Sequence, residues 1–291
     1  MLAPGSHVPV MLAESLEYLA IKPDGVYCDL TAGLGGHTRA IAERLTTGFV
    51  IACDRDAESL DRAKENTAEF ADRIHFHQVR FSRAKEALAA EGVSQLDGLL
   101  ADLGVSRYQL TGGERGFSLM TDGVLDMRMD RSQGTTAADL VNFESEEGLA
   151  DLIYKFGEER RSRQIARAIV RARPIKTTGQ LAKLIEGAAR RTGKIHPATQ
   201  TFMALRIAVN GEMEELDALL ESIPQMVKAG GRAVVLTFMS LEDRKVKQSF
   251  QAMARSGRAQ ILTRHVMRPA ELEIRNNSAS RSAKMRAVTL V

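Results

Sequence analysis

Residues 26–37 read V-Y-C-D-L-T-A-G-L-G-G-H, and this stretch decides the fold. Val26 to Leu30 is a short apolar run, which is typical of a buried parallel strand. The glycines at positions 33, 35 and 36 then break the pattern, and an amphipathic run from Thr38 to Leu45 predicts a helix. A strand, a glycine turn and a helix together bring backbone N–H groups and a helix N-terminus close to a ligand.

The second apolar run, Phe49 to Cys53, ends at Asp54, which lies 21 residues after Gly33. A carboxylate at the tip of the second strand can accept hydrogen bonds from both hydroxyls of an adenosine ribose. The glycines alone are equally compatible with a tight turn that binds nothing. With the acid at this distance, we expect a cofactor that contains a nucleoside.

The glycine spacing indicates which cofactor this is. A dinucleotide fingerprint, G-x-G-x-x-G, would need its third glycine at position 38, where this chain has Thr38. The observed pattern, with Asp29 and Thr31 ahead of Gly33, Gly35 and Gly36, resembles the loop of class I S-adenosylmethionine methyltransferases. A cofactor without a pyrophosphate does not require the third glycine.

Length and composition set the class of protein. The chain of 291 residues, 44% of them hydrophobic, is long enough for one large or two modest domains with a sizeable core. Its net charge of +3 confines any nucleic-acid surface to one part of the molecule. Cys28 and Cys53 fall in predicted strands, show no metal-ligand spacing and fit a reducing compartment. No secretory signal or membrane span is evident, so we expect a cytoplasmic protein that needs no metal.

Further strands place two more candidate residues. Ile74 to Val79 predicts a third strand, and Phe81 behind it is either a ring that flanks an adenine or a core aromatic. Leu96 to Leu103 predicts a fourth strand that Asp102 closes. Ligands of open parallel sheets bind at the carboxyl ends of the strands, so Asp102 is the candidate that faces both cofactor and substrate. Helices are expected over residues 57–70 and 82–91, the latter with Ser82 as its N-cap.

The next buried strand is Arg232 to Phe238, about 130 residues later, which predicts a sizeable insertion. Helical patterns in it cover residues 137–143, 146–156, 160–173 and 180–190, and one long helix is expected from Pro197 to Ile223. After the fifth strand, Ser240 and Asp243 fit a capping box for a helix over 241–253. Residues 260–263 and 287–291 predict closing strands.

The insertion carries most of the positive charge. Residues 155–194 contain twelve Lys or Arg against three Glu, and Arg160, Arg163, Arg167 and Arg171 share one helix stripe. A solvated helix face normally carries both positive and negative side chains, whereas this one is almost entirely positive. The excess favours a phosphate backbone as partner over a merely solvated surface. A second basic stretch, 264–286, has six positive and two negative residues.

Nine blocks along the chain form one ordered set. They are H-V-P-V-M-L from His7, G-L-G-G-H-T from Gly33, A-D-L-G-V-S from Ala101, E-R-G-F-S-L from Glu114, L-D-M-R-M-D from Leu125, G-E-E-R from Gly157, I-H-P-A-T-Q-T-F-M-A-L-R-I-A-V-N from Ile195, S-L-E-D-R from Ser240 and S-R-S-A-K-M-R from Ser280. In this order they resemble one family, the bacterial 16S ribosomal RNA cytosine-N4 methyltransferases, also called RsmH or MraW. The resemblance runs nearly end to end.

The resemblance implies an α/β class I methyltransferase fold, which is Rossmann-like with a mostly parallel seven-stranded sheet and an inserted all-helical domain. Residues 1–110 and 205–291 would form the S-adenosylmethionine-binding domain, and residues 111–204 the helical insertion that recognises RNA. The reaction would methylate the N4 amine of a decoding-site cytidine in 16S ribosomal RNA, with the small ribosomal subunit as partner. The oligomeric state stays open, with a homodimer as one alternative.

Site residues carry over by position. Those predicted to bind S-adenosylmethionine are Gly33, Gly35, Gly36, His37, Asp54, Phe81, Asp102 and Gln109. Those predicted to bind substrate are Arg160, Arg163, Arg167, Arg206 and Asn210. Asp102 is the candidate catalytic residue, because an acceptor for the amine hydrogens would direct the nitrogen lone pair toward the methyl group.

Departures from the family pattern keep alternatives open. Met239 stands where the family has a histidine, and Arg107-Tyr108 replaces a small residue and a proline. A ribosome-assembly factor that binds RNA without methyl transfer is therefore one alternative. A nicotinamide-dependent oxidoreductase is another, disfavoured by the missing third glycine and the basic insertion. Methylation at C5 of cytosine is disfavoured, because neither Cys28 nor Cys53 lies near the end of the fourth or fifth strand.

Overall fold

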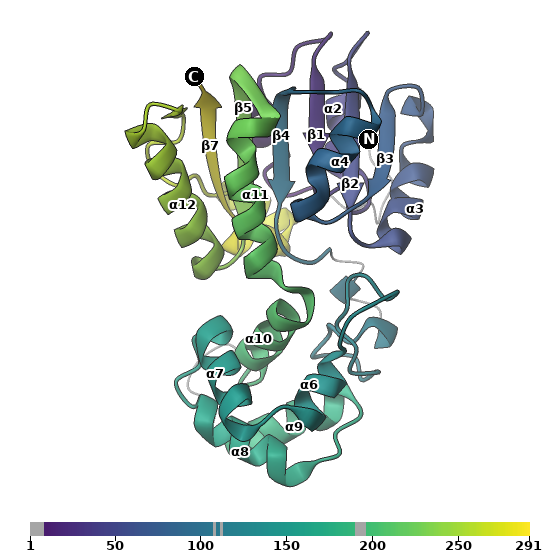
Figure 1. The fold of residues 1–291 in the computed structure, drawn as a ribbon. Coiled ribbons are helices and arrows are strands. Elements are labelled where there is room, and N and C mark those ends of the chain that lie inside the picture. Colours follow the sequence, from purple (N-terminus) through teal and green to yellow (C-terminus); the bar gives the residue numbers. More distant parts are fainter. Residues whose placement is uncertain (1–8, 107–108, 111–112, 190–195) are drawn as a thin grey trace. The chain divides into compact units, whose positions relative to one another are not determined.

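The computed structural model describes residues 9–106, 109–110, 113–189 and 196–291, so His7, Arg107 and Tyr108 lie outside the described part. The chain divides into two compact units, one made of residues 1–104 and 214–291 and the other of residues 105–213 (Figure 1). The second unit begins earlier and ends later than the expected insertion at 111–204.

A seven-stranded sheet forms the centre of the first unit (Figure 1). Its strands are β1 (Val26–Asp29), β2 (Phe49–Asp54), β3 (Ile74–Gln78), β4 (Leu96–Asp102), β5 (Val227–Thr237), β6 (Ala259–Ile261) and β7 (Lys284–Leu290), in the spatial order β3-β2-β1-β4-β5-β7-β6. The first five run parallel to one another, and β7 is antiparallel to both of its neighbours. The predicted mostly parallel sheet is confirmed.

Helices cover both faces of this sheet. Two separate cores show which helices share a face: α1 (Leu12–Leu19), α2 (Gly36–Ala42) and α3 (Ala57–Asn66) pack on one, and α4 (Ala84–Ala90), α11 (Glu212–Met226) and α12 (Ser240–Arg255) on the other. Because both faces are buried, the central strands read as continuous apolar runs. The remaining short helices are α13 (Glu271–Asn276) and the 3-10 turns Ala68–Phe70, Phe81–Arg83 and Ser278–Ser282.

The second unit is built from helices. They are α6 (Ala137–Phe143), α7 (Glu146–Gly157), α8 (Ser162–Ala172), α9 (Thr178–Ala188) and α10 (Thr199–Asn210), preceded by a 3-10 turn, Gly113–Arg115. They enclose a core of their own, in which Leu125, Ile153, Ile165, Ile185 and Leu205 are fully buried. In the described part of this unit, extended pairing is limited to one isolated bridge, between Val124 and Thr177.

Three local predictions are wrong, for local or tertiary reasons. The long helix expected over 197–223 is two helices, because Gly211 takes a left-handed φ of 57° and ends α10. Ser82 does not cap α4; its hydroxyl and amide instead donate to the carboxylate of Glu215 on α11. Asp243 does not cap α12, since it pairs with Arg286 of β7.

The bounds of several elements also differ from prediction. β5 begins at Val227 rather than 232, and its pairing with β4 shifts register between Leu96 and Gly98. Asn66 ends α3, and a separate 3-10 turn follows where one helix over 57–70 was expected. β7 begins at Lys284, before the expected 287, and β6 ends at Ile261, before the expected 263.

Candidate active site

The Asp29 carboxylate holds the glycine loop in place through hydrogen bonds. Its side chain is fully buried at the end of β1. One carboxylate oxygen accepts the Thr31 backbone N–H at 3.0 Å, and the other accepts the Thr38 hydroxyl at 2.7 Å. The Thr31 hydroxyl in turn accepts the backbone N–H of Asp102 at 2.7 Å. The loop, the start of α2 and the end of β4 are therefore fixed to one another.

Two glycines in the loop adopt conformations that other residues rarely take. Gly33 has a φ of 52° and Gly35 a φ of 87°, both in the left-handed region. A Cβ on Gly35 would also lie 2.8 Å from Thr67 Cγ2. The backbone conformation and the close packing against Thr67 thus both require glycine at position 35.

Asp54 ends β2 beside this loop. Its Oδ2 accepts the Gly33 backbone N–H at 2.9 Å, and its Oδ1 accepts the Asp56 N–H at 2.9 Å. Burial raises the pKa of Asp54 to about 6, although these two hydrogen bonds act in the opposite direction. The carboxylate is therefore locked in orientation and retains lone pairs for a further donor.

Asp102 closes β4 at the same edge of the sheet. Burial, reinforced by the nearby carboxylates of Asp29 and Glu242, raises the pKa of Asp102 to about 8. Its Oδ1 is buried and has no hydrogen-bond partner among the described residues. Its Oδ2 lies 3.7 Å from Nδ1 of His37, whose Nε2 is 3.2 Å from the carbonyl oxygen of Val10. A donor or a cation at this edge would satisfy Asp102.

Glu242 is a site residue that the sequence analysis missed. It is buried in the first turn of α12, where its Oε2 accepts the backbone N–H of Phe238 at 3.0 Å and that of Met239 at 3.2 Å. It thereby fixes the chain just after β5. The S-L-E-D motif does signal a helix cap, but Glu242 accepts the capping hydrogen bonds, not the predicted Asp243.

The other predicted cofactor residues have different surroundings. Gly36 and His37 begin α2, so they share the edge with Asp54 and Asp102. Phe81 follows β3 and is half-buried against the core, and its place beside an adenine stays a prediction. Gln109 belongs to the second unit, where its side chain is buried and its Oε1 accepts the Ser106 N–H at 2.9 Å.

The arginine stripe of the second unit lies on and just before α8. This helix buries Ile165, Ala166 and Ile169, and Arg160, Arg163, Arg167 and Arg171 are all exposed, as the periodicity predicted. Arg167 makes one surface ion pair, at 3.3 Å, with Glu146. Arg160, Arg163 and Arg171 have no ion pair with any described residue, so this surface has a local positive excess.

Comparison with known proteins gives the family. A sequence profile of the MraW methylase family matches residues 5–291. The chain belongs to the MraW methylase family. A curated relative from Solibacter usitatus, Ribosomal RNA small subunit methyltransferase H, is 60% identical over 284 residues, covering 98% of this chain and 99% of its own. Relatives of the same name from Acidobacterium capsulatum and Koribacter versatilis are each 47% identical, covering 97% of this chain and 97% and 93% of theirs.

Membership in the MraW family confirms the family resemblance drawn from the nine sequence blocks. The fold class is confirmed by the strand order together with the family, and S-adenosylmethionine is confirmed as the cofactor of a methylase of this fold. Among the described residues of this MraW methylase, no helix combines the length and apolar character needed to cross a bilayer.

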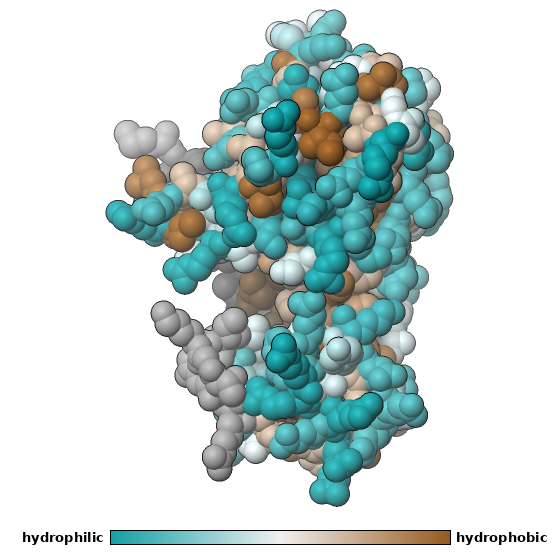
Figure 2. All heavy atoms as spheres, turned by 90° about the vertical axis from the view of Figure 1, so that its left-hand side faces the viewer, coloured by the Kyte–Doolittle hydropathy of each residue, from teal (hydrophilic) through white to brown (hydrophobic). Residues whose placement is uncertain are grey.

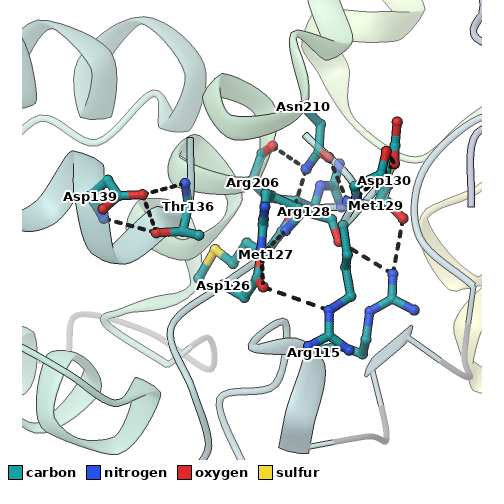
Figure 3. A network of polar contacts seen from close by, with 12 residues as sticks. Arg115, Asp126, Met127, Arg128, Met129, Asp130, Thr136, Asp139, Arg206 and Asn210 are labelled. Atoms are coloured by element: carbon teal, nitrogen blue, oxygen red, sulfur yellow. Dashed lines mark hydrogen bonds and ion pairs between the residues drawn. The ribbon is translucent and has the colours of Figure 1, made fainter. Parts of the chain in front are cut away.

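A polar network in the second unit of this MraW methylase surrounds Asn210 (Figure 3). Asn210 is 3% exposed; its Oδ1 accepts the Met129 N–H at 2.8 Å, and its Nδ2 donates to the carbonyls of Met127 and Arg206. Met127 has a left-handed φ of 61°, which is uncommon for a side chain of this size. The network thus holds a turn that the sequence alone would not favour.

Charged side chains complete this network. The Arg115 guanidinium donates to the carbonyls of Arg128 and Met129, and Arg128 forms a two-pronged pair with the buried Asp126 (Figure 3). Arg206, one of the predicted substrate residues, forms a two-pronged pair with Glu212, both bonds 2.8 Å. The structure therefore gives Arg206 and Asn210 intramolecular partners, whereas Arg160, Arg163 and Arg171 have no ion pair with any described residue.

Proposed function

We propose that this chain transfers a methyl group to the N4 amine of a decoding-site cytidine in 16S ribosomal RNA, within the small ribosomal subunit in the cytoplasm. One observation carries the proposal: 60% identity to a ribosomal RNA small subunit methyltransferase H, with both chains covered almost completely. Amine methylation also fits the thiols, since Cys28 and Cys53 are buried in β1 and β2 and supply no nucleophile for attack on a ring carbon.

The residues at the carboxyl edge fit a cationic ligand that carries hydroxyl groups. Three features support this fit: the buried Oδ1 of Asp102, which has no hydrogen-bond partner among the described residues, the raised pKa of that carboxyl, and the oriented carboxylate of Asp54. In this proposal Asp54 holds the ribose hydroxyls, and the other cofactor contacts are Gly33, Gly35, Gly36, His37, Phe81, Asp102 and Gln109. When bound, S-adenosylmethionine supplies an electrophilic methyl group on a sulfonium.

The chain's own contribution is chiefly to position the reactants. We assign to Asp102 the orientation of the cytosine amine, because its carboxylate can accept an amine hydrogen. Such a bond favours the nitrogen lone pair as the attacking group. Asp29 and Thr31 fix the backbone of Asp102, and Glu242 fixes the adjacent end of β5. The target base must leave its stack to reach this edge.

Two groups of second-unit residues take different roles in RNA binding. Arg160, Arg163 and Arg167 are exposed and can each donate to phosphate oxygens. Asn210 acts on the substrate indirectly by holding the turn at residues 127–130, and Arg206 acts indirectly through its ion pair with Glu212, just after the end of α10. RNA recognition by the insertion is thus assigned to its basic surface and to a braced turn.

The test uses tritiated S-adenosylmethionine and small ribosomal subunits that lack the modification. After incubation, the RNA is digested and the labelled nucleoside identified. Label in N4-methylcytidine is the expected result. Label in another nucleoside would overturn the assigned specificity. The absence of label, with the cofactor bound tightly, would instead favour an assembly factor without methyl transfer.

A variant pair separates the roles of the residues. Asp102→Asn should reduce turnover on subunits. Replacing Arg160, Arg163 and Arg167 by Gln should raise KM for subunits and leave cofactor affinity unchanged. Equal KM values for this triple variant and the unaltered protein would remove these arginines from RNA binding.

A further inference from the structure

The segment between β6 and β7, residues 262–283, lies at the carboxyl edge of the catalytic sheet. Lys284, the first residue of β7, pairs with Thr237, the last residue of β5. Because β5 runs parallel to β2 and β4, its end shares an edge with Asp54 and Asp102. The segment therefore borders the side of the sheet where the cofactor loop lies.

Specific contacts hold this segment in place. Met267 and Met285 exchange backbone hydrogen bonds of 3.0 and 3.2 Å, and the Thr263 hydroxyl accepts the Ala287 N–H at 3.0 Å. Glu273 of α13 accepts the Met11 N–H at 2.8 Å, which joins the segment to the residue before α1. The segment presents a surface fixed at several points along its length.

The charges of the segment divide into two classes. Lys284 and Arg286, which follow it on β7, pair with Asp243, and Arg275 pairs with Glu271 within α13. Three other arginines are exposed and have no ion pair with any described residue. They are Arg264, Arg268 and Arg281. The acidic residues of the segment are already engaged, so these three charges are not balanced locally.

The three arginines flank the fixed points of the segment. Arg264 follows Thr263 and Arg268 follows Met267, and both of those residues are bonded to β7. Arg281 lies between the buried Ser280 and Ala283, whose N–H donates to the Ser280 carbonyl at 2.8 Å. In the view of Figure 2, apolar side chains form small separate patches among hydrophilic ones.

We propose that Arg264, Arg268 and Arg281 form a phosphate-binding surface that contacts ribosomal RNA beside the target nucleotide. The inference rests on the proposed function, and it gives the catalytic unit its own RNA contact in addition to the arginines near α8. Guanidinium groups match phosphate oxygens with two parallel hydrogen bonds. A contact at the edge where the methyl group is transferred would fix the RNA close to the reacting base.

The test replaces all three arginines by Gln and measures affinity for protein-free small-subunit ribosomal RNA at several salt concentrations. The slope of log K against log salt is negative, and each lost phosphate contact reduces its magnitude by about 0.7 to 0.9, so the three changes should reduce it by about 2 to 3. Affinity near 0.1 M salt should fall about tenfold or more.

The matched control removes three exposed charges from the same unit, Lys247, Arg255 and Arg258, also by Gln. The last two lie away from the carboxyl edge, since the Arg258 carbonyl accepts the N–H of Val291, beyond the far end of β7. Cofactor affinity, measured for both variants, shows that each remains folded. If the triple Gln variant loses cofactor affinity, the three single Arg→Gln replacements are measured instead, and each should reduce the magnitude of the slope by about 0.7 to 0.9.

Each outcome decides the question. A larger loss of RNA affinity and slope in the 264/268/281 variant than in the control supports the surface. Equal losses overturn it while the proposed function stands, provided that the unaltered protein labels N4-methylcytidine. A loss seen on whole subunits but not on protein-free RNA would also overturn it, because the partner would then be a ribosomal protein. Failure of the unaltered protein to label RNA would overturn the proposed function itself.

Discussion

Replacing Asn210 by Ala tests whether this residue braces the second unit or contacts substrate directly. The amide makes three hydrogen bonds, to Met129 N, Met127 O and Arg206 O, at 2.8, 2.7 and 2.8 Å. Arg206 O can retain its helical bond after the change, but the backbone groups of the buried Met127 and Met129 lose a partner. An unsatisfied buried group costs about 1–3 kcal/mol, so the free energy of unfolding should fall by roughly 3 kcal/mol.

The assay must follow the second unit by itself. Denaturant unfolding should be monitored by hydrogen exchange of peptides from residues 105–213, with the amide of Met129 as the local probe. The matched control is Gln164→Ala, because the exposed Gln164 of the same unit donates a hydrogen bond to the Ala188 carbonyl at 2.7 Å. That change should cost less than about 1 kcal/mol.

One pattern of results would refute this reasoning. If Asn210→Ala loses less than about 1 kcal/mol and Met129 keeps its exchange protection, the bonds of Asn210 do not stabilise the turn. A raised KM for RNA with unchanged stability would then assign Asn210 to direct substrate contact. A loss of stability together with a raised KM, restored by low temperature, is expected if the turn acts on the substrate through its shape.

Three further predictions concern the cofactor edge. The pKa of Asp102 is raised to about 8, so its side chain is mostly neutral below that pH, whereas a cationic ligand binds better to the carboxylate. Cofactor affinity, measured by calorimetry, should therefore rise by up to about tenfold per pH unit from pH 6 to 8. Asp102→Asn should flatten this rise. Asp54→Asn, which removes a charged acceptor, should weaken cofactor binding by about tenfold to a hundredfold, and an unchanged Kd would exclude Asp54 from the ribose. Gly35→Ala should lower the free energy of unfolding by about 2 kcal/mol, because φ is 87° and the new Cβ would lie 2.8 Å from Thr67 Cγ2. The control is Gly92→Ala, where φ is 67° and no atom lies within 4 Å of the new Cβ; it should cost only about 1 kcal/mol.

The sequence predicts the sheet and its carboxyl edge well, because these depend on local signals. Apolar runs buried on both faces mark the parallel strands, and each predicted acid, Asp54 and Asp102, does close its strand. The glycine turn likewise follows from local spacing. These features do not depend on distant residues, so hydrophobic periodicity and the positions of glycines and acids are enough to predict them.

The errors occur where a distant residue takes over a local role. Ser82 looks like an N-cap, but Glu215, 133 positions away, accepts its hydrogen bonds. Asp243 looks like part of a capping box, but its carboxylate forms an ion pair with Arg286, 43 positions away. Asn210 bonds to Met129, 81 positions earlier, so its bracing role was not visible in its own motif.

The position of the insertion has a consequence for synthesis of the chain. β4 is a central strand, and its partner on one side, β5, is separated from it by the whole second unit. As the chain emerges, the insertion is complete before β5 exists, so it can fold while β4 still has one unpaired side. Nascent chains that expose residues up to 213 should therefore contain a protease-resistant insertion while one side of β4 is still unpaired, and release of the last strands should pair that side.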